Sequence, residues 1–326
     1  MTENLAQISI PAELTRRWSI SSAFLIADTP TSLVYRVTLA DASSAIVKAL
    51  KPKGMGELPG MAFLEWCDGY GAVRLIDRVH HICLLEDAGD MTLREYRVLH
   101  GETSSNAIIV DTLKKLHSDR PRPTPELTPL RKHFEALFQR ALRETNDELS
   151  PVLRHAASIA EDLLSNQVNV RPLHGDLHHN NIIFSHDRGW LTIDPQGLLG
   201  DGAYDVANVF GNPLGAFDDI INPARIATLV SMFADALGCH EEKILRYALA
   251  HAGVSICWSL EDGGTVLSND NARERLVFST WLPAFFKDRS ITTARRYRGH
   301  SPKNARNFSI RASVSSPNDF GASLQE

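Results

Sequence analysis

Several features that define large protein classes are missing from this sequence, and each absence excludes one of them. The four cysteines among 326 residues lie far apart and form no CxxC pair, so neither a zinc ribbon nor a disulfide framework is indicated. No run of about 18 apolar residues occurs, so we expect no membrane span. The pattern GxxxxGK followed by Ser or Thr is absent, which excludes a P-loop enzyme. We expect a cytoplasmic globular protein with reduced thiols.

A large excess of charge of one sign is also absent. Lys and Arg number 34, Asp and Glu number 39, and the formal net charge is −5. Because dedicated nucleic-acid binders usually carry a basic face, we expect no nucleic-acid partner. Residues 294–326 are basic and rich in Ser and Asn, without a helical period, and we expect this tail to be disordered. The remaining chain is more acidic, which favours a cationic small molecule as ligand. The sequence leaves the oligomeric state open.

Apolar periodicity predicts an α+β fold with a β-rich first part and a mainly helical remainder. In the first part we expect an antiparallel sheet interrupted by one helix over 57–66. Its strands are predicted at Ser32–Leu39, 45–50, 72–76 and 81–85. The remainder is predicted to contain helices over 105–116, 130–142, 152–164 and from about 201 to 286, and a hairpin of two short strands over 181–185 and 190–194.

The densest group of chemistry-bearing residues is the segment HGDLHHNN at 174–181, followed thirteen residues later by Asp194. Within it Asn181 follows Asp176 by five residues, and Asp194 ends the second strand of the predicted hairpin. This order suits phosphoryl transfer from a nucleotide, in which one carboxylate, Asp176, accepts the proton of the attacking hydroxyl. Asn181 and Asp194 offer the oxygen ligands that Mg²⁺ prefers.

These motifs resemble those of the aminoglycoside phosphotransferase family, which is related to the protein kinases. The segment 174–181 is similar to the family's catalytic loop, and IDP at 193–195 is similar to its second metal motif. The stretch GDGAYDVAN at 200–208 resembles the family's Gly-Asp-Pro-Ala-Tyr-Asp-Leu-Ala, with Gly202 where Pro is usual. Three further stretches resemble the streptomycin 6-phosphotransferase and hydroxyurea phosphotransferase branch: LIAD and SLV within 25–34, AIVKALK at 45–51, and GAVRL at 71–75.

The resemblance implies a two-lobed protein-kinase-like fold that uses ATP and Mg²⁺. A small β-rich lobe over 1–88 would bind the nucleotide, a larger helical lobe over 89–293 would carry catalysis and substrate binding, and the tail would follow at 294–326. The implied activity is transfer of the γ-phosphoryl to the 6-hydroxyl of streptomycin, which confers antibiotic resistance. The alternatives are hydroxyurea, another aminoglycoside or a metabolite as acceptor, and a non-catalytic binding protein with the same fold.

A kinase-like fold also needs a strand lysine for the nucleotide phosphates and a helix carboxylate that pairs with it. Lys48, in the second predicted strand, suits the first role. Either Glu57 or Glu65 can be its partner, and the resemblance favours Glu57. The turn over 28–32 lies where a kinase has its glycine-rich loop, but it contains no glycine.

The resemblance assigns two further regions. Glu86, Asp87 and Ala88 follow the last predicted strand and correspond to the hinge between the lobes, whose backbone hydrogen-bonds the adenine. The C-terminal lobe of this family supplies an acidic substrate cleft. Glu261 and Asp262 are therefore candidates for substrate contact.

The clustered histidines 174, 178 and 179 raise the alternative of a zinc hydrolase. Their order with Asp176 is H-x-D-x-H-H, which differs from the H-x-H-x-D-H of binuclear hydrolases. We therefore favour structural roles for His174 and His178 in shaping the loop, and a solvent-facing position for His179.

Overall fold

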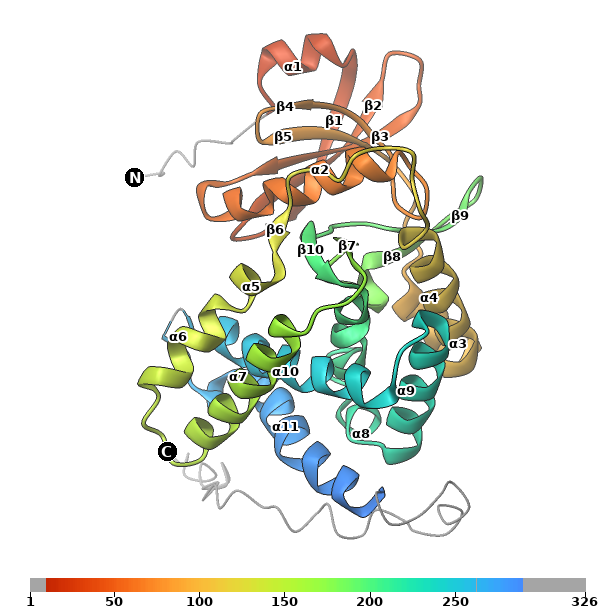
Figure 1. Ribbon diagram of the computed structural model, residues 1–326. Helices are drawn as coiled ribbons and strands as arrows, with labels where there is room; N and C mark the ends of the chain where they lie inside the picture. The colour runs from red at the N-terminus through yellow and green to blue at the C-terminus, as the bar shows by residue number, and fades with distance from the viewer. Residues whose placement is uncertain (1–9, 262, 290–326) are drawn as a thin grey trace, which may run out of the picture. The chain divides into compact units, whose positions relative to one another are not determined.

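The computed structural model describes residues 10–261 and 263–289. Its contacts form two compact units, residues 1–285 and residues 286–326. In the second unit the described residues are 286–289, the last turn of a helix. The predicted tail over 294–326 lies outside the described residues. In the first unit a five-stranded sheet with two helices precedes a large helical region (Figure 1). This is the predicted α+β, two-lobed arrangement.

The large sheet is antiparallel throughout, with strand order β1-β2-β3-β5-β4. The predicted strands at Ser32–Leu39 (β2) and 45–50 (β3, Ser44–Leu50) are confirmed. The third predicted strand begins later than expected, because Val73 donates its amide hydrogen to Thr192, outside this sheet. Its observed bounds, and those of the other elements of this lobe, are α1 Ala12–Arg17, β1 Ile20–Asp28, η1 Pro52–Glu57, α2 Leu58–Cys67, β4 Leu75–Val79 and β5 Ile82–Glu86.

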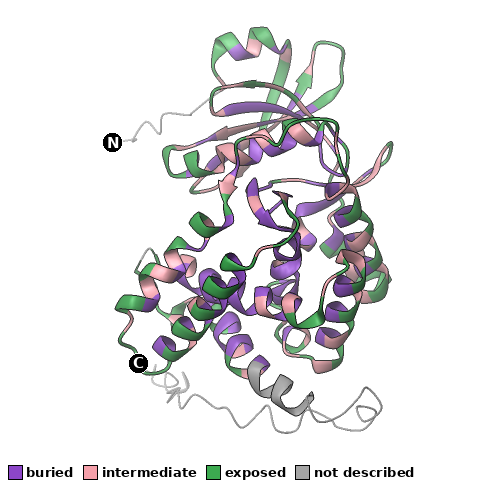
Figure 2. Cartoon of the chain, viewed as in Figure 1, coloured by how far each residue is buried: buried purple, intermediate pink, exposed green. Residues whose placement is uncertain are grey.

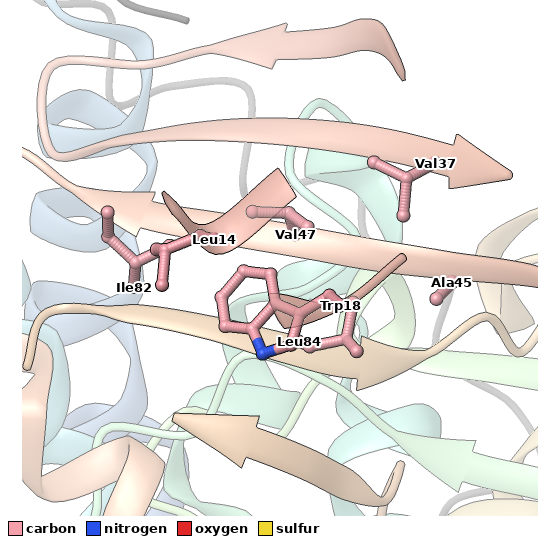
Figure 3. Packing of buried hydrophobic residues seen from close by; sticks show 7 residues of the cluster. All are labelled: Leu14, Trp18, Val37, Ala45, Val47, Ile82 and Leu84. Atoms are coloured by element: carbon pink, nitrogen blue, oxygen red, sulfur yellow. The ribbon is translucent and has the colours of Figure 1, made fainter. Parts of the chain in front are cut away.

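A small apolar core lies between α1 and one face of this sheet (Figure 3). Trp18 is at its centre, and its indole nitrogen donates to Asp77 Oδ2 at 2.6 Å. Side chains of a strand alternate between the two faces, so Ala45 and Val47 of β3 point into this core. Lys48 therefore points to the opposite face of the sheet. The other residues of the core are Leu14, Val37, Ile82 and Leu84.

The helical region is built around α10, Glu241–Ser259, which is buried along most of its length (Figure 2). It packs against α6, α7, α9 and the 3₁₀ segment η3. The predicted helix over 130–142 is broken at Phe134, and the segment after Asp201 begins as a 3₁₀ helix. The bounds are α3 Leu93–His100, α4 Glu102–Leu116, α5 Leu130–His133, α6 Glu135–Arg143, α7 Leu149–Ser165, η3 Gly202–Gly211, α8 Phe217–Ile220, α9 Pro223–Leu237, η4 Val266–Ser268 and α11 Asp270–Arg289.

None of the helices in the described ranges is both long enough and apolar enough to cross a membrane.

Short strands carry the motif residues between the sheet and the helices. The strands β6 (Thr128–Pro129), β10 (Leu198–Asp201) and β7 (Val170–Leu173) form a small three-stranded sheet. The strands β8 (Ile182–Ser185) and β9 (Gly189–Thr192) form the predicted hairpin. The segment 174–181 connects β7 to β8 and ends in the short 3₁₀ helix η2, His179–Asn181. Asp194 follows β9 by two residues.

Two glycines allow the backbone of α2 to touch the backbone that follows Asp194. A Cβ atom added to Gly60 would overlap the carbonyl oxygen of Pro195. A Cβ added to Gly197, which has a φ of +68°, would overlap the backbone of Pro59. Only residues without a side chain fit at this contact. The contact brings the start of α2, and with it Glu57, next to Asp194.

We predict that Gly60→Ala lowers the free energy of unfolding by about 1–3 kcal/mol, because the new methyl group forces two backbones apart. Gly56→Ala is the matched control, since a Cβ at that position meets nothing within 4 Å. Urea denaturation of both variants measures the difference. Equal stability of the two variants would contradict this contact.

Candidate active site

Lys48 of β3 lies between two carboxylates. Its Nζ donates to Glu57 Oε2 at 2.7 Å and forms an ion pair with Asp194. Burial alone would lower the pKa of the Lys48 ammonium, but the charges of Asp194 and Glu57 outweigh burial and raise it, so the amine is charged. Glu65, the other glutamate considered, is exposed, and its backbone oxygen accepts from Arg122 at 3.2 Å. Glu57 is the glutamate that contacts Lys48.

Asp176 is held by donors on both carboxylate oxygens. Its Oδ1 accepts from Asn208 Nδ2 at 2.7 Å, and its Oδ2 accepts from Asn181 Nδ2 at 3.0 Å. His178 Nε2 lies 3.5 Å from Oδ2. Burial would raise the pKa of the Asp176 carboxyl, but His178 opposes it by charge and hydrogen bonding, and the pKa falls to about 2. The carboxyl is therefore ionised at neutral pH.

The oxygen atoms that Asn181 and Asp194 offer near Asp176 suit a magnesium ion. Asn181 uses its amide nitrogen to bond Asp176, so its amide oxygen is the atom left for a metal. The Asp194 side chain is 54% exposed. Within the described ranges, no group of three or more His, Cys, Asp or Glu side chains could hold a metal. Mg²⁺ needs no such cage, because it is commonly bound by one or two protein oxygens together with nucleotide phosphates.

The backbone at Asp194 has an unusual conformation for a residue with a side chain. Its φ is +59°, in the left-handed region. Such positions cost free energy and are concentrated at functional sites. Here the conformation aims the carboxylate at Lys48 while the chain turns into Pro195.

His174 connects the loop of Asp176 with the segment of Asp194. The ring is fully buried; its Nδ1 accepts from the amide of Asp176 at 3.2 Å and its Nε2 donates to the carbonyl of Ile193 at 3.0 Å. These partners require the neutral tautomer with the proton on Nε2. Burial lowers the pKa of His174, which agrees with a neutral ring. The structural role predicted for His174 is thus explained.

Asp205 supports the same loop from behind. It accepts from the amides of Gly175 at 2.7 Å and His174 at 3.2 Å, and from His117 Nε2 at 2.8 Å. Asp201 caps η3 by accepting from the amide of Ala203 at 3.1 Å. Both aspartates are buried and bond backbone amides, and Asp201 also forms an ion pair with Lys243.

Two residues that position Asp176 were not assigned a role from the sequence. Asn208 donates to Asp176, and its own Oδ1 accepts from Arg275 Nη2 at 2.9 Å. Arg275 of α11 is 4% exposed and also donates from Nε to Asn271 at 3.2 Å. Asn208 is the last residue of the stretch 200–208 that resembles a family motif, so the sequence already drew attention to this position. Arg275 belongs to no motif, and its role depends on how α11 packs.

At the predicted hinge, the acidic side chains are engaged within the protein. Glu86 accepts from the amide of Arg74 at 2.8 Å and forms an ion pair with Arg188. Asp87 pairs with Arg36 at 2.8 Å. In the described part of the chain, no backbone hydrogen bond outside the strands involves Ala88. The backbone, rather than the carboxylates, is what this segment can offer to a ligand.

The glycine-free turn over 28–32 is closed on itself. Thr29 Oγ1 accepts from the amides of Ser32 at 2.9 Å and Thr31 at 3.3 Å. Lys51 pairs with Asp28 and donates to the carbonyl of Thr29 at 2.6 Å. Two amides that a phosphate cradle would use are occupied, which leaves Lys48 as the main candidate phosphate ligand of this lobe.

The predicted substrate residues are not brought to Asp176 by a described contact. Glu261 is exposed and lines a groove of about 410 Å³ with Arg140, Arg143 and Glu144. Asp262 lies outside the described residues. Both assignments stay predictions.

The expectation that His179 faces solvent is wrong. Its side chain belongs to the buried set at 1% exposure, and neither ring nitrogen has a hydrogen-bond partner among the described residues. Burial, reinforced by the charges of Arg225 and Arg97, lowers the pKa of His179 to about 3. His178 instead accepts from the amide of Asn180 at 3.2 Å and caps η2. No sequence pattern distinguished the two adjacent histidines.

Solved structures with a similar fold include kinases of small molecules. An amicoumacin kinase in complex with AMP-PNP, Ca²⁺ and its ligand has a TM-score of 0.61 at 14% identity, covering 82% of this chain and 92% of that one. A thermostable aminoglycoside phosphotransferase mutant in complex with ADP and hygromycin B has a TM-score of 0.57 at 14% identity, covering 86% and 98%. The fold is the protein-kinase-like fold of aminoglycoside and choline kinases.

Sequence comparison narrows this class to one family. The model of the aminoglycoside/hydroxyurea antibiotic resistance kinase family matches residues 17–263. A streptomycin 3''-kinase from Klebsiella pneumoniae is 34% identical over 76% of this chain and 91% of that protein. A streptomycin 6-kinase from Streptomyces glaucescens is 24% identical (78% and 83%), and a hydroxyurea phosphotransferase from Kitasatospora aureofaciens is 27% identical (78% and 74%). The chain belongs to the aminoglycoside/hydroxyurea antibiotic resistance kinase family.

The buried, neutral His179 predicts a specific loss of stability in acid. Its pKa of about 3 in the folded protein lies below the value of about 6.5 in the unfolded chain, so its neutral form is favoured by folding. Stability is complete above about pH 6.5 and falls as the pH decreases towards 3; the loss from this group at pH 5 is about 2 kcal/mol.

The variant His179→Leu should lack this part of the loss. We expect the difference in unfolding free energy between pH 7.5 and pH 5 to shrink by about 2 kcal/mol. His155→Leu changes an exposed histidine and is the control. If both variants keep the pH dependence of the natural protein, His179 is not buried in the neutral form.

Proposed function

We propose that this protein transfers the γ-phosphoryl group of ATP to a hydroxyl of streptomycin, and so confers resistance to it. The observation that carries the proposal is that His174 links the loop in which Asn181 bonds Asp176 to the segment in which Asp194 pairs with Lys48. These four residues offer an ionised carboxylate, two oxygen groups suited to Mg²⁺ and a charged amine, the groups that phosphoryl transfer requires. Streptomycin is a cation, which suits the net negative charge of the chain.

The nucleotide would be held at the sheet. In this proposal the Lys48 ammonium binds the nucleotide phosphates, and Glu57 holds the ammonium in place. The backbone at Glu86, Asp87 and Ala88 hydrogen-bonds the adenine. Bound at Asn181 and Asp194, Mg²⁺ would neutralise charge on the phosphates.

Asp176 would act mainly by orientation. With a pKa of about 2 it is a weak base towards an alcohol, so it cannot remove the proton before the reaction begins. It accepts a hydrogen bond from the acceptor hydroxyl and aligns the oxygen with the phosphorus atom. The proton passes to the carboxylate late, when formation of the P–O bond has made the hydroxyl acidic. Asn208 and Asn181 keep the carboxylate in position.

The position of transfer on streptomycin has two candidates. The sequence motifs favour the 6-hydroxyl. The higher identity to a streptomycin 3''-kinase, 34% against 24% for a 6-kinase, favours the 3''-hydroxyl. Phosphorus–proton correlation NMR of the purified product assigns the modified carbon and decides between them.

Asp176→Asn tests the role of the carboxylate in the proposed reaction. We predict that it lowers kcat with streptomycin by about 10²–10⁴-fold, because the variant cannot accept the proton. Its affinity for AMP-PNP should stay within threefold of that of the natural protein. Asp187→Asn, at an exposed turn, is the control and should keep full activity. Near-normal turnover of Asp176→Asn would contradict the mechanism.

A panel of acceptors tests the substrate. ATP consumption is measured with streptomycin, hydroxyurea, other aminoglycosides and simple alcohols. Streptomycin should give the highest kcat/KM. A higher value with hydroxyurea or another compound would replace streptomycin as the substrate, and nucleotide binding without turnover on any acceptor would favour the non-catalytic alternative.

A further inference from the structure

A cavity lies beside His117, the histidine that bonds Asp205. It has a volume of about 230 Å³. Its walls come from the end of α4, from β7, from the start of η3 and from the segment that joins α9 to α10. A cavity of this size holds a small ion or functional group with water, and it is too small for an aminoglycoside.

Positive charge is in excess in this cavity. Lys114, Arg171 and Lys243 line it, and Asp201 is its single acidic side chain. Asp201 is already engaged by Lys243 and by backbone amides. The guanidinium of Arg171 and the ammonium of Lys114 remain, so the cavity has a positive net charge. The whole chain has a net charge of −5. An anion would compensate these charges.

Two buried polar atoms at the cavity have no partner among the described residues. They are Nδ1 of His117, whose side chain is 6% exposed, and Nε of Arg171. Gly202 packs closely against both side chains: a Cβ there would lie 3.4 Å from His117 Nδ1 and 3.3 Å from Arg171 Cδ, so a side chain at this position would crowd them. Buried polar atoms without partners are costly, and a bound ion or water is one way in which proteins satisfy them.

The hydrogen-bonding groups of His117 limit which anions the cavity could bind. Its Nε2 faces the carboxylate of Asp205 and donates to it, so in the neutral ring Nδ1 is an acceptor. An anion beside a neutral His117 has to accept from Arg171 and Lys114 and also donate one hydrogen bond. A monohydrogen phosphate group does both, through its P–O⁻ oxygens and its P–OH. Sulfate carries no proton at neutral pH and cannot donate.

We propose that this cavity binds a phosphate group, either as inorganic phosphate or as the end of a small phosphate monoester. The site is separate from the proposed phosphoryl-transfer centre and does not depend on the proposed function. It is connected to that centre, because Asp205 bonds both His117 and the amides of His174 and Gly175. A phosphate bound at His117 would therefore stabilise the loop of Asp176.

Cys239 gives a local reporter, because it lines the cavity and the other three cysteines are buried. The measurement is the rate of Cys239 alkylation by iodoacetamide at pH 8, at constant ionic strength, in chloride, sulfate or inorganic phosphate. We expect phosphate to slow alkylation at least fivefold with a saturable concentration dependence, and sulfate to protect less. A glycerol phosphate series then tells the monoester from the free ion by its affinity.

Two variants localise the effect. Lys114→Met removes an exposed cation from the wall, and Gly202→Ala places a methyl group beside His117. Each should weaken phosphate protection at least threefold, whereas Lys132→Met, an exposed lysine outside the cavity, should leave it unchanged. Protection should persist with saturating AMP-PNP.

Three results would overturn the proposal. They are equal alkylation rates in phosphate and chloride, undiminished protection in Lys114→Met and Gly202→Ala, and loss of protection when AMP-PNP fills the nucleotide site.

Discussion

The ion pairs of Lys48 with Glu57 and Asp194 are the interaction on which the rest of the structure depends. They join three parts of the chain: strand β3, the start of helix α2, and the segment after β9. The glycine contact between Gly60 and Pro195 brings these parts close enough to pair. A buried amine with two carboxylates keeps its charge, so the same arrangement that fixes the geometry also keeps a cation in place, the one to which we assign phosphate binding.

The loop of Asp176 is held in a comparable way, by hydrogen bonds to its backbone and to the Asp176 carboxylate. His174 links the amide of Asp176 to the carbonyl of Ile193, and Asp205 holds the loop's own amides. Asn208 and Asn181 fix the Asp176 carboxylate before any ligand binds. Such preorganisation removes the cost of reorienting dipoles during reaction, which is the main way in which enzymes stabilise phosphoryl transfer.

Local patterns in the sequence predicted strands with several buried apolar positions, such as β2 and β3. The edge strand β1 was missed because its positions are almost all exposed and carry no alternation. Spacing alone indicated Asp176, Asn181 and Asp194, since these flank one short hairpin, the first two before β8 and the third after β9. The approach of Lys48 to Asp194, 146 residues apart, followed only from the resemblance to a family. The contact of Arg275 with Asn208 and the burial of His179 depend on how segments far apart in the sequence pack together. No local sequence pattern predicts such packing.

The central claim is that Asp194 and Lys48 together receive a magnesium-bound triphosphate, and calorimetry of AMP-PNP binding with and without Mg²⁺ tests it most directly. In the natural protein, Mg²⁺ should increase the affinity for AMP-PNP. In Asp194→Asn that increase should fall at least tenfold, while the affinity without Mg²⁺ changes little because Lys48 and Glu57 remain. An unchanged effect of Mg²⁺ in Asp194→Asn would contradict the account.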